Sequence, residues 1–112
     1  MNRSSSPVLS IITVCFNAGK FIESTIQSVL AQTYPHIEYI IVDGASSDNT
    51  MEVVEKYRSR LAAVISEKDK GLYDAMNKGM QLATGDYLLF LNADDVLADE
   101  QVVSKIFAAC TN

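Results

Sequence analysis

The hydrophobic positions of this chain alternate between two patterns, short continuous runs and longer stretches with helical spacing. The continuous runs are rich in β-branched and aromatic residues and predict four strands, at 8–16, 37–43, 62–66 and 86–92. The amphipathic stretches predict four helices, at 20–32, after the loop at 44–50, at 72–83 and at 99–110. Because the connections are too long for hairpins, the alternation predicts an α/β, Rossmann-like fold with a mostly parallel sheet and right-handed crossovers. The third strand is shorter than the others, which favours a place near the sheet edge.

The helical spacing also predicts which side chains face the core. These are Ile22, Ile26, Val29 and Leu30; Val53, Val54, Tyr57 and Leu61; Leu72, Ala75, Met76, Gly79, Met80 and Ala83; and Val102, Val103, Ile106 and Phe107. Residues Ser47, Asp48 and Thr50 are candidates for capping the second helix. Gly85 is expected to end the third helix, because glycine tolerates the left-handed conformation.

The length and composition are those of one small globular domain. The formal net charge is −5 and no run of lysine or arginine occurs, which argues against a nucleic-acid partner. No apolar stretch approaches the roughly 20 residues that span a bilayer, so no transmembrane segment is expected. Residues 1–7 are expected to form a flexible lead-in and residues 8–112 the folded domain. Cys15 and Cys110 fit a reduced cytoplasmic environment, and neither is expected to be catalytic.

Acidic residues follow three of the four predicted strands. The strand ends carry Asn17, Asp43, Glu67 to Asp69, and Asn92 to Asp95. In a parallel sheet these ends share one edge, which is where ligands gather. Carboxylates at one edge repel each other unless a positive charge lies between them, so this pattern indicates a bound cation or a ligand.

Familiar phosphate-binding motifs are absent. The turn after the first strand contains only Gly19, so it matches neither the three-glycine dinucleotide motif nor the Walker loop. His36 precedes a strand and has no second metal-binding residue nearby, so it is not expected to be a ligand. In contrast, the strand at 86–92 runs into Asn92, Ala93, Asp94 and Asp95, whose oxygen atoms suit Mg²⁺ or Mn²⁺. The two aspartates are expected to project to different sides of an extended chain. The alternative is a solvated turn in which Asp94 or Asp95 caps the next helix.

The motifs "SIITVCFNAGKFIESTIQSVLAQTYPHIEYIIVDGASSDNT" and "EKDKGLYDAMNKGMQLATGDYLLFLNADD" together resemble the nucleotide-binding half of the family 2 glycosyltransferases. The resemblance covers residues 8 to about 108, in the order and spacing of that family. It implies the GT-A fold, a nucleoside-diphosphate sugar as donor (a UDP-sugar above all), a saccharide or lipid-linked acceptor, and an inverting reaction. The stretch "SEKDKGLYDAMNKG" is similar to members that build bacterial surface polysaccharides, which work in the cytoplasm or at the inner face of the membrane.

The resemblance also assigns roles to residues. Phe16 and Asn17 match positions that wall the base and ribose. Asp43 matches the first acid of the "DDGS" turn and is expected to contact the nucleotide sugar. The second acid of that turn, which in the family commonly contacts the base or ribose, is Gly44 here, and Asp69 is the candidate to replace it. Asn77 matches the asparagine of an "ArN.G" pattern.

The "NADD" segment matches the DXD-type motif of the family. In that match Asn92 replaces the first aspartate, Asp94 faces the ribose or sugar, and Asp95 holds the Mn²⁺ or Mg²⁺, with Asp94 beside it. The general base of the family lies in a later, acceptor-binding half, so it is expected beyond Asn112. Two other functions remain open: a non-catalytic nucleotide-binding or scaffolding module, and a nucleotidyltransferase. Tyr73 and Asp74 could lean over the site, with a surface role as the alternative.

Overall fold

A computed structural model describes residues 6–110, and its helices and strands alternate along the chain. The elements are β1 (Leu9–Cys15), α1 (Ile22–Leu30), β2 (Ile37–Asp43), α2 (Thr50–Lys56), the short 3₁₀ helix η2 (Arg58–Arg60), β3 (Ala63–Ser66), α3 (Leu72–Leu82), β4 (Tyr87–Phe90) and α4 (Val102–Cys110). Each predicted strand and helix is present; β2 has the predicted bounds, and most other elements are shorter by one to a few residues. Most of the predicted lead-in, residues 1–5, lies outside the described residues, so the predicted division at residues 1–7 and 8–112 stays a prediction.

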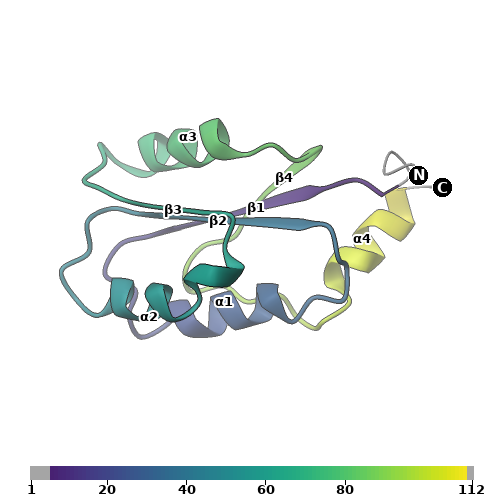
Figure 1. Ribbon diagram of the computed structural model, residues 1–112, viewed down its shortest axis with the longest axis horizontal. Coiled ribbons are helices and arrows are strands. Elements are labelled where there is room, and N and C mark those ends of the chain that lie inside the picture. Colours follow the sequence, from purple (N-terminus) through teal and green to yellow (C-terminus); the bar gives the residue numbers. More distant parts are fainter. Residues whose placement is uncertain (1–5, 111–112) are drawn as a thin grey trace.

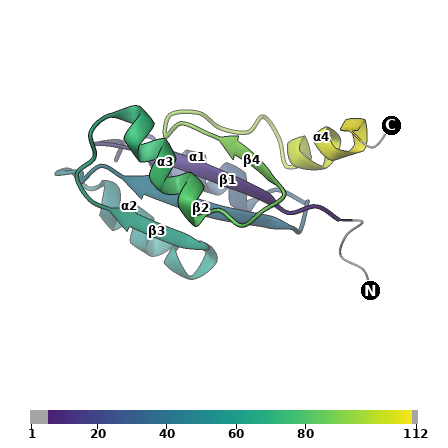
Figure 2. The same cartoon turned by 90° about the horizontal axis from the view of Figure 1, so that it is seen from above.

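The four strands form one parallel sheet in the order β3-β2-β1-β4. β1 lies in the middle, where Leu9 pairs with Ile37 of β2 and with Tyr87 of β4. The sheet separates two layers of helices, with α3 on one face and α1, α2 and α4 on the other (Figures 1 and 2). This arrangement confirms the α/β fold, the parallel sheet and the edge position of β3.

Two apolar clusters fill the space on the two faces of the sheet. Alternate residues of β1 point to opposite faces, so Ile11 belongs to the cluster under α1, α2 and α4, and Ile12 to the cluster under α3. The larger cluster takes in Val54 of α2 and Val103 of α4, both fully buried. The predicted inward positions of α1 and α2 are confirmed, since each is buried or packs against this cluster.

The contact of α3 with the sheet is made by the small residues of its predicted inward face. Ala75 and Gly79 are buried, and a Cβ on Gly79 would lie 2.5 Å from Cγ2 of Ile12. At so short a separation larger side chains are displaced to the margins of the helix, so Leu72 and Met80 are exposed rather than in the core. Ile106 of α4 is likewise 43% exposed, against its predicted inward position.

Gly85 has a different role from the one predicted. Its backbone is not among those with a positive φ, and α3 ends instead at Ala83, whose backbone is extended. A Cβ on Gly85 would lie 2.5 Å from the Ser10 Oγ and 2.8 Å from the Val8 carbonyl oxygen. Glycine is therefore needed because β4 begins in close contact with the start of β1.

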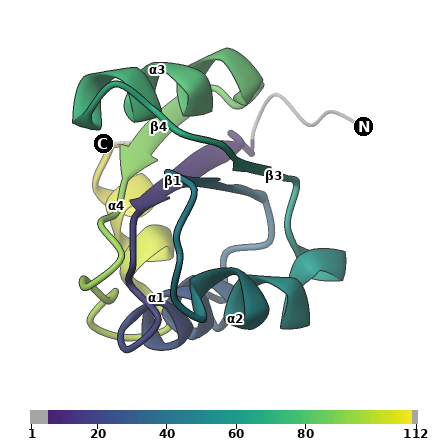
Figure 3. The same ribbon diagram turned by 90° about the vertical axis from the view of Figure 1, so that its left-hand side faces the viewer.

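The carboxyl ends of all four strands lie at one end of the molecule. Figure 3 looks at this end, with α3 and β4 on one side and the loops that lead into α1 and α2 on the other. Because ligands bind at the carboxyl ends of the strands in parallel sheets, these loops are the place to look for a site.

Over residues 6–110, the structure contains no helix with the length and apolar character needed to cross a membrane.

Candidate functional site

A cavity of about 520 Å³ opens at the carboxyl ends of the strands. Its wall is built from the end of β1 and the residues after it, the loop before α3, and the segment after β4. Five residues predicted to bind a ligand line it: Phe16, Asn17, Asp69, Asn92 and Asp94. The volume is within the usual range for small-molecule sites, about 300–1,000 Å³. Three segments that are far apart in sequence thus meet at one site.

Part of the cavity wall is apolar and open to solvent. The side chains of Phe16, Phe21 and Leu72 line it, and each is more than half exposed. Exposed aromatic rings in a cleft are surfaces on which a flat ligand can lie, and they are costly to leave in water. The apolar wall therefore favours a ligand with an aromatic or other flat part.

Asn17 shapes the loop beside the cavity. Its backbone is in the left-handed region, with φ at 50°, which asparagine tolerates better than most residues. The side-chain oxygen of Asn17 accepts hydrogen bonds from the backbone N–H groups of Ser47 (2.8 Å) and Asp48 (3.3 Å). Its own backbone N–H donates to the Ser46 Oγ at 2.7 Å. Asn17 therefore ties the segment after β1 to the loop after β2.

A second set of hydrogen bonds continues this connection. One carboxylate oxygen of Asp48 accepts from the Gly19 N–H at 3.0 Å and the other from the Thr50 N–H at 2.9 Å. The buried Thr50 hydroxyl donates to Asp48 and accepts from the Ala18 N–H at 2.8 Å. Hydrogen bonds from the Thr50 hydroxyl, and from the Thr50 and Gly19 N–H groups, lower the pKa of Asp48 despite partial desolvation. The N-cap residue of α2 is Asn49, which makes no side-chain capping bond, so none of the candidates Ser47, Asp48 and Thr50 is the N-cap. Asp48 and Thr50 have a structural role instead, because they hold the loop after β2 against the segment after β1.

Asp43, predicted to contact the nucleotide, is completely buried and does not line the cavity. Its Oδ2 accepts from the Ser46 N–H at 2.9 Å and from the Ser66 hydroxyl at 2.8 Å, and its Oδ1 accepts from the Ser46 hydroxyl. The Cys15 thiol also contacts Oδ1, at 3.5 Å. Asp43 therefore holds the loop after β2 against the end of β3, and its contact with a nucleotide stays a prediction.

The segment after β4 is a turn rather than an extended strand end. β4 ends at Phe90, and the Asp95 N–H donates to the Asn92 carbonyl oxygen at 3.0 Å. The expected extended geometry is therefore wrong, and the alternative of a solvated turn is confirmed. The capping role in that alternative is wrong, because α4 begins only at Val102. Asn92 and Asp94 face the cavity, whereas Asp95 is exposed and does not line it.

Thr25 of α1 anchors this turn. Its buried hydroxyl lies 2.7 Å from the Ala93 carbonyl oxygen and 2.6 Å from the Asp95 carbonyl oxygen, and it donates its single proton to one of them at a time. The carboxylates of Asp94 and Asp95 have no hydrogen-bond partner within residues 6–110. The backbone of the turn is therefore fixed while its two carboxylates stay available.

Asn77 lies outside this cavity. It lines a separate hollow of about 360 Å³ together with Glu67, Asp74 and Lys78. Burial opposes the charge on Lys78, but its contacts with Glu67 and Asp74 outweigh that effect and raise its pKa. The structure does not bring Asn77 to the other predicted residues, so its part in ligand binding stays a prediction.

Cys15 is buried beside the cavity floor. Burial, together with the neighbouring Asp43 carboxylate, raises the pKa of its thiol. A thiol of this kind is a poor nucleophile at neutral pH. The side chain of Cys110 lies outside the described part of the structure.

Sequence reasoning did not identify Phe21 and Leu72 as cavity residues. Leu72 was assigned to the core because it fits the helical spacing of α3, yet it is the first residue of that helix and lies over the cavity. Phe21 immediately precedes α1 and is not part of its buried stripe. The available signal for Phe21 was an aromatic residue directly before a helix and off its apolar stripe.

Together, a parallel sheet and an apolar and acidic cavity at its carboxyl end define an α/β domain that binds small molecules at its strand ends. The sequence model of Glycosyl transferase family 2 matches residues 10–111. The chain belongs to this family.

Two proteins that are named glycosyltransferases are similar to this chain in sequence. TuaG of Bacillus subtilis strain 168, named for teichuronic acid biosynthesis, is 41% identical over 92 residues, which cover 80% of this chain and 36% of TuaG. A PGL/p-HBAD biosynthesis glycosyltransferase of Mycobacterium tuberculosis is 35% identical over 107 residues, covering 93% of this chain and 42% of that protein. The chain thus spans less than half the length of these relatives.

Solved structures share the fold. Residues 1–349 of S. aureus TarS, crystallised with UDP-GlcNAc, superpose with a TM-score of 0.81 at 27% identity, covering 90% of this chain and 30% of that one. The mannosyltransferase PcManGT of Pyrobaculum calidifontis, in complex with GDP-Man and Mn²⁺, gives a TM-score of 0.78 at 27% identity, covering 84% of this chain and 29% of that one. The expected GT-A fold is therefore confirmed.

Proposed function

We propose that this protein is an inverting glycosyltransferase of cell-surface polysaccharide synthesis, and that residues 8–112 bind its nucleoside-diphosphate sugar. The observation that carries this proposal is the cavity at the strand ends of a chain that belongs to Glycosyl transferase family 2. The UDP-GlcNAc bound by TarS and the GDP-Man bound by PcManGT support a donor of this class. The name of TuaG supports the polysaccharide role.

In this proposal the apolar and acidic sides of the cavity bind different parts of the donor. Phe16 and Phe21 offer ring faces to the nucleoside, because base–aromatic stacking contributes about 1–3 kcal/mol per base. The turn at 92–95 lies against the diphosphate and sugar. The apolar wall thus orients the donor, and the turn after β4 receives its charged end.

The carboxylates of Asp94 and Asp95 could hold a divalent cation together with the phosphates of the donor. No group of three His, Cys, Asp or Glu side chains able to hold a metal is present between residues 6 and 110. Mg²⁺ needs no such group, because it is commonly held by one or two carboxylates together with substrate phosphates and water. The cation, Mn²⁺ or Mg²⁺, would neutralise charge on the diphosphate as it leaves the sugar. The Mn²⁺ in the PcManGT complex supports a divalent cation at this site.

In the reaction, the bond between the anomeric carbon and the diphosphate oxygen breaks as an acceptor hydroxyl oxygen bonds to that carbon. A base must remove the hydroxyl proton from the opposite face of the sugar. We assign that base, and the binding of a saccharide or lipid-linked acceptor, to residues outside 1–112. The residues of this chain position the donor and shield it from water.

The test is thermal unfolding of the protein with UDP, GDP, CDP and ADP, each with and without Mn²⁺. A nucleotide present at 100 times its dissociation constant should stabilise the fold by about 2.7 kcal/mol through mass action. We expect a rise in melting temperature that depends on Mn²⁺ with at least one nucleotide. No shift with any of the four at millimolar concentration would contradict the proposal.

A further inference from the structure

Gly44 is buried, and the space beside its Cα is already occupied. A Cβ on residue 44 would lie 2.8 Å from the Oδ2 of Asp69 and 3.5 Å from Cδ1 of Phe16. Gly44 is not among the residues with positive φ, so its backbone conformation does not itself require glycine. The Asp69 carboxylate therefore lies where a side chain on residue 44 would begin, at the edge of the Phe16 ring.

The position of Asp69 is fixed by its own loop. Its Oδ1 accepts a hydrogen bond from the Gly71 N–H at 3.0 Å. Gly71 has a φ of 118°, a conformation that other residues rarely adopt, and this bend turns the chain into α3. Thus one carboxylate oxygen is used inside the loop to hold the side chain in place.

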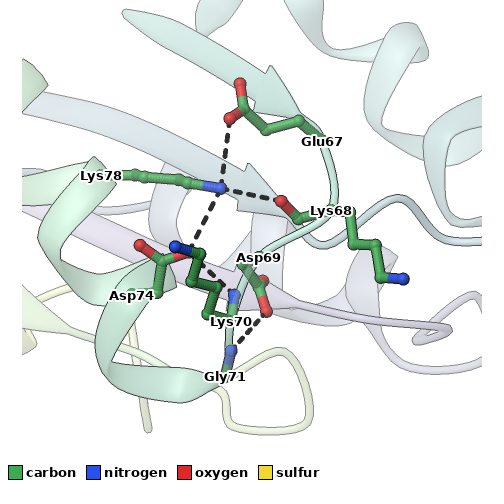
Figure 4. A network of polar contacts seen from close by, with 7 residues as sticks. All are labelled: Glu67, Lys68, Asp69, Lys70, Gly71, Asp74 and Lys78. Carbon is green, nitrogen blue, oxygen red and sulfur yellow. Dashed lines mark hydrogen bonds and ion pairs between the residues drawn. The ribbon is translucent and has the colours of Figure 1, made fainter.

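A network around Lys78 holds the rest of the loop against α3 (Figure 4). The Lys78 Nζ lies 3.2 Å from Glu67 Oε2 and donates to the Lys68 carbonyl oxygen at 3.1 Å. Asp74 accepts from the Lys70 N–H at 2.8 Å and lies 3.5 Å from the Lys78 Nζ. Only 18% of the Lys78 side chain is exposed, whereas 61% of the Glu67 side chain is, so the network is shielded at the lysine and open to water at Glu67.

The second oxygen of Asp69, Oδ2, has no hydrogen-bond partner within the described residues 6–110. It is thus a fixed acceptor on the cavity wall, next to an exposed aromatic ring. A base lying on the Phe16 ring would present its edge, not its face, to this carboxylate. An ionised carboxylate only accepts hydrogen bonds, so it favours a base edge whose ring nitrogen carries a proton.

We propose that Asp69 selects the base of the donor, by accepting a hydrogen bond from the protonated ring nitrogen of uracil or guanine lying on Phe16. Cytosine and adenine present an unprotonated ring nitrogen at the corresponding edge, which the carboxylate repels. Asp69 would then take the role that the family resemblance gives to an acid at residue 44. This inference rests on the proposed function, because it concerns the same donor site.

The experiment measures the dissociation constants of UDP, GDP, CDP and ADP with Mn²⁺ by calorimetry. The wild type, Asp69→Asn and a control, Glu100→Gln, are compared. Glu100 is exposed and its backbone carbonyl contacts Thr33 at the opposite end of the sheet, so the control removes the same charge away from the cavity. Circular dichroism and thermal unfolding establish that each variant is folded.

We expect the wild type and Glu100→Gln to bind UDP or GDP at least tenfold more tightly than CDP and ADP. In Asp69→Asn this preference should fall about tenfold while the affinity for CDP is kept or rises, because the amide can also donate to an unprotonated ring nitrogen. The double variant Gly44→Asp with Asp69→Gly places the carboxylate on residue 44 instead of residue 69, in the same space. In this variant the preference for UDP or GDP over CDP and ADP should return.

Each other outcome has a distinct meaning. Equal binding of all four nucleotides by the wild type overturns the role of Asp69 and leaves the donor-binding function in place. The same holds if Asp69→Asn weakens all four nucleotides equally or leaves the preference unchanged. Failure of the wild type to bind any of the four overturns both the inference and the function on which it rests.

Discussion

The acidic residues in the loops that follow the strands fall into two groups, which differ in whether their carboxylates are hydrogen-bonded within the protein. Asp43 and Asp48 accept hydrogen bonds from protein donors through both carboxylate oxygens. Asp94 and Asp95 are exposed, and within residues 6–110 their carboxylates have no hydrogen-bond partner. In sequence, Asp43, Asp94 and Asp95 look alike, as acids at the end of an apolar strand.

The difference shows that a site of this kind needs two sorts of acid. The satisfied carboxylates connect the loops after β1, β2 and β3 and so give the cavity its shape. The unsatisfied carboxylates repel each other in the absence of a ligand, which a stable fold tolerates only at an exposed position. The four predictions below test this division, from the largest expected effect to the smallest.

Removal of the Asp43 carboxylate should have the largest effect on stability. In Asp43→Ala the Ser46 and Ser66 groups lose a buried acceptor, and we expect the free energy of unfolding to fall by about 3 kcal/mol. Urea denaturation measures this change. The matched control Asp94→Ala should alter stability by less than about 0.5 kcal/mol. Equal losses in the two variants would contradict the division into two groups.

Neutralising Asp94 or Asp95 should weaken ligand binding and leave the stability of the fold unchanged. Asp94→Asn and Asp95→Asn each remove one negative charge from the turn that we assign to the cation. Loss of a charged contact worth about 1.5–3 kcal/mol corresponds to at least tenfold weaker binding of nucleotide in the presence of Mn²⁺. Calorimetry measures the affinity, and the melting temperature without ligand should not change. If Asp95→Asn binds nucleotide and Mn²⁺ as the wild type does, its assignment to the metal is wrong.

Thr25 lies between the two groups, because a buried hydroxyl fixes the backbone of the turn that carries the free carboxylates. In Thr25→Val the shape is kept and the donor is lost, so we expect a loss of about 1–2 kcal/mol in the free energy of unfolding. Thr25→Ser keeps the hydroxyl and should lose less. Full stability in Thr25→Val, measured by urea denaturation, would show that the hydrogen bonds of the Thr25 hydroxyl do not stabilise the turn.

The smallest effect concerns acid stability. The pKa of Asp48 is lower in the folded protein than its ordinary value of 3.8, because the Thr50 hydroxyl and N–H donate to its carboxylate. The stabilisation is therefore complete above pH 3.8 and disappears as the pH falls through the lower folded-state pKa. Asp48→Asn should flatten the dependence of unfolding free energy on pH below 3.8. A slope identical to that of the wild type would contradict the role of these hydrogen bonds.

The sequence was sufficient for the fold because periodicity reports directly on burial. Continuous apolar runs gave the four strands, and the bounds of β2 agree at both ends with the predicted 37–43. Periodicity failed where two elements approach closely. The small residues of α3 set a short distance to the sheet, and that distance, rather than helical spacing, decides that Met80 is exposed.

The site was predicted less completely, for a different reason. Parallel topology places all strand ends at one edge, which was enough to bring Phe16, Asp69 and Asp94 to one cavity. Topology does not say which loop donors reach a given carboxylate. The burial of Asp43 depends on serines 3 and 23 residues away, and the position of Asn77 depends on which face of α3 meets the sheet. Such contacts are set by tertiary packing and leave no local pattern.

The crowding at Gly44 also couples the effects of substitutions at residues 44 and 69. A side chain at residue 44 would lie 2.8 Å from the Asp69 carboxylate in its present place. Because the crowded atom is the free end of the Asp69 side chain, a residue larger than glycine at position 44 would turn that carboxylate away from the Phe16 ring. Mutations at the two positions, although 25 residues apart, are therefore expected to have non-additive effects.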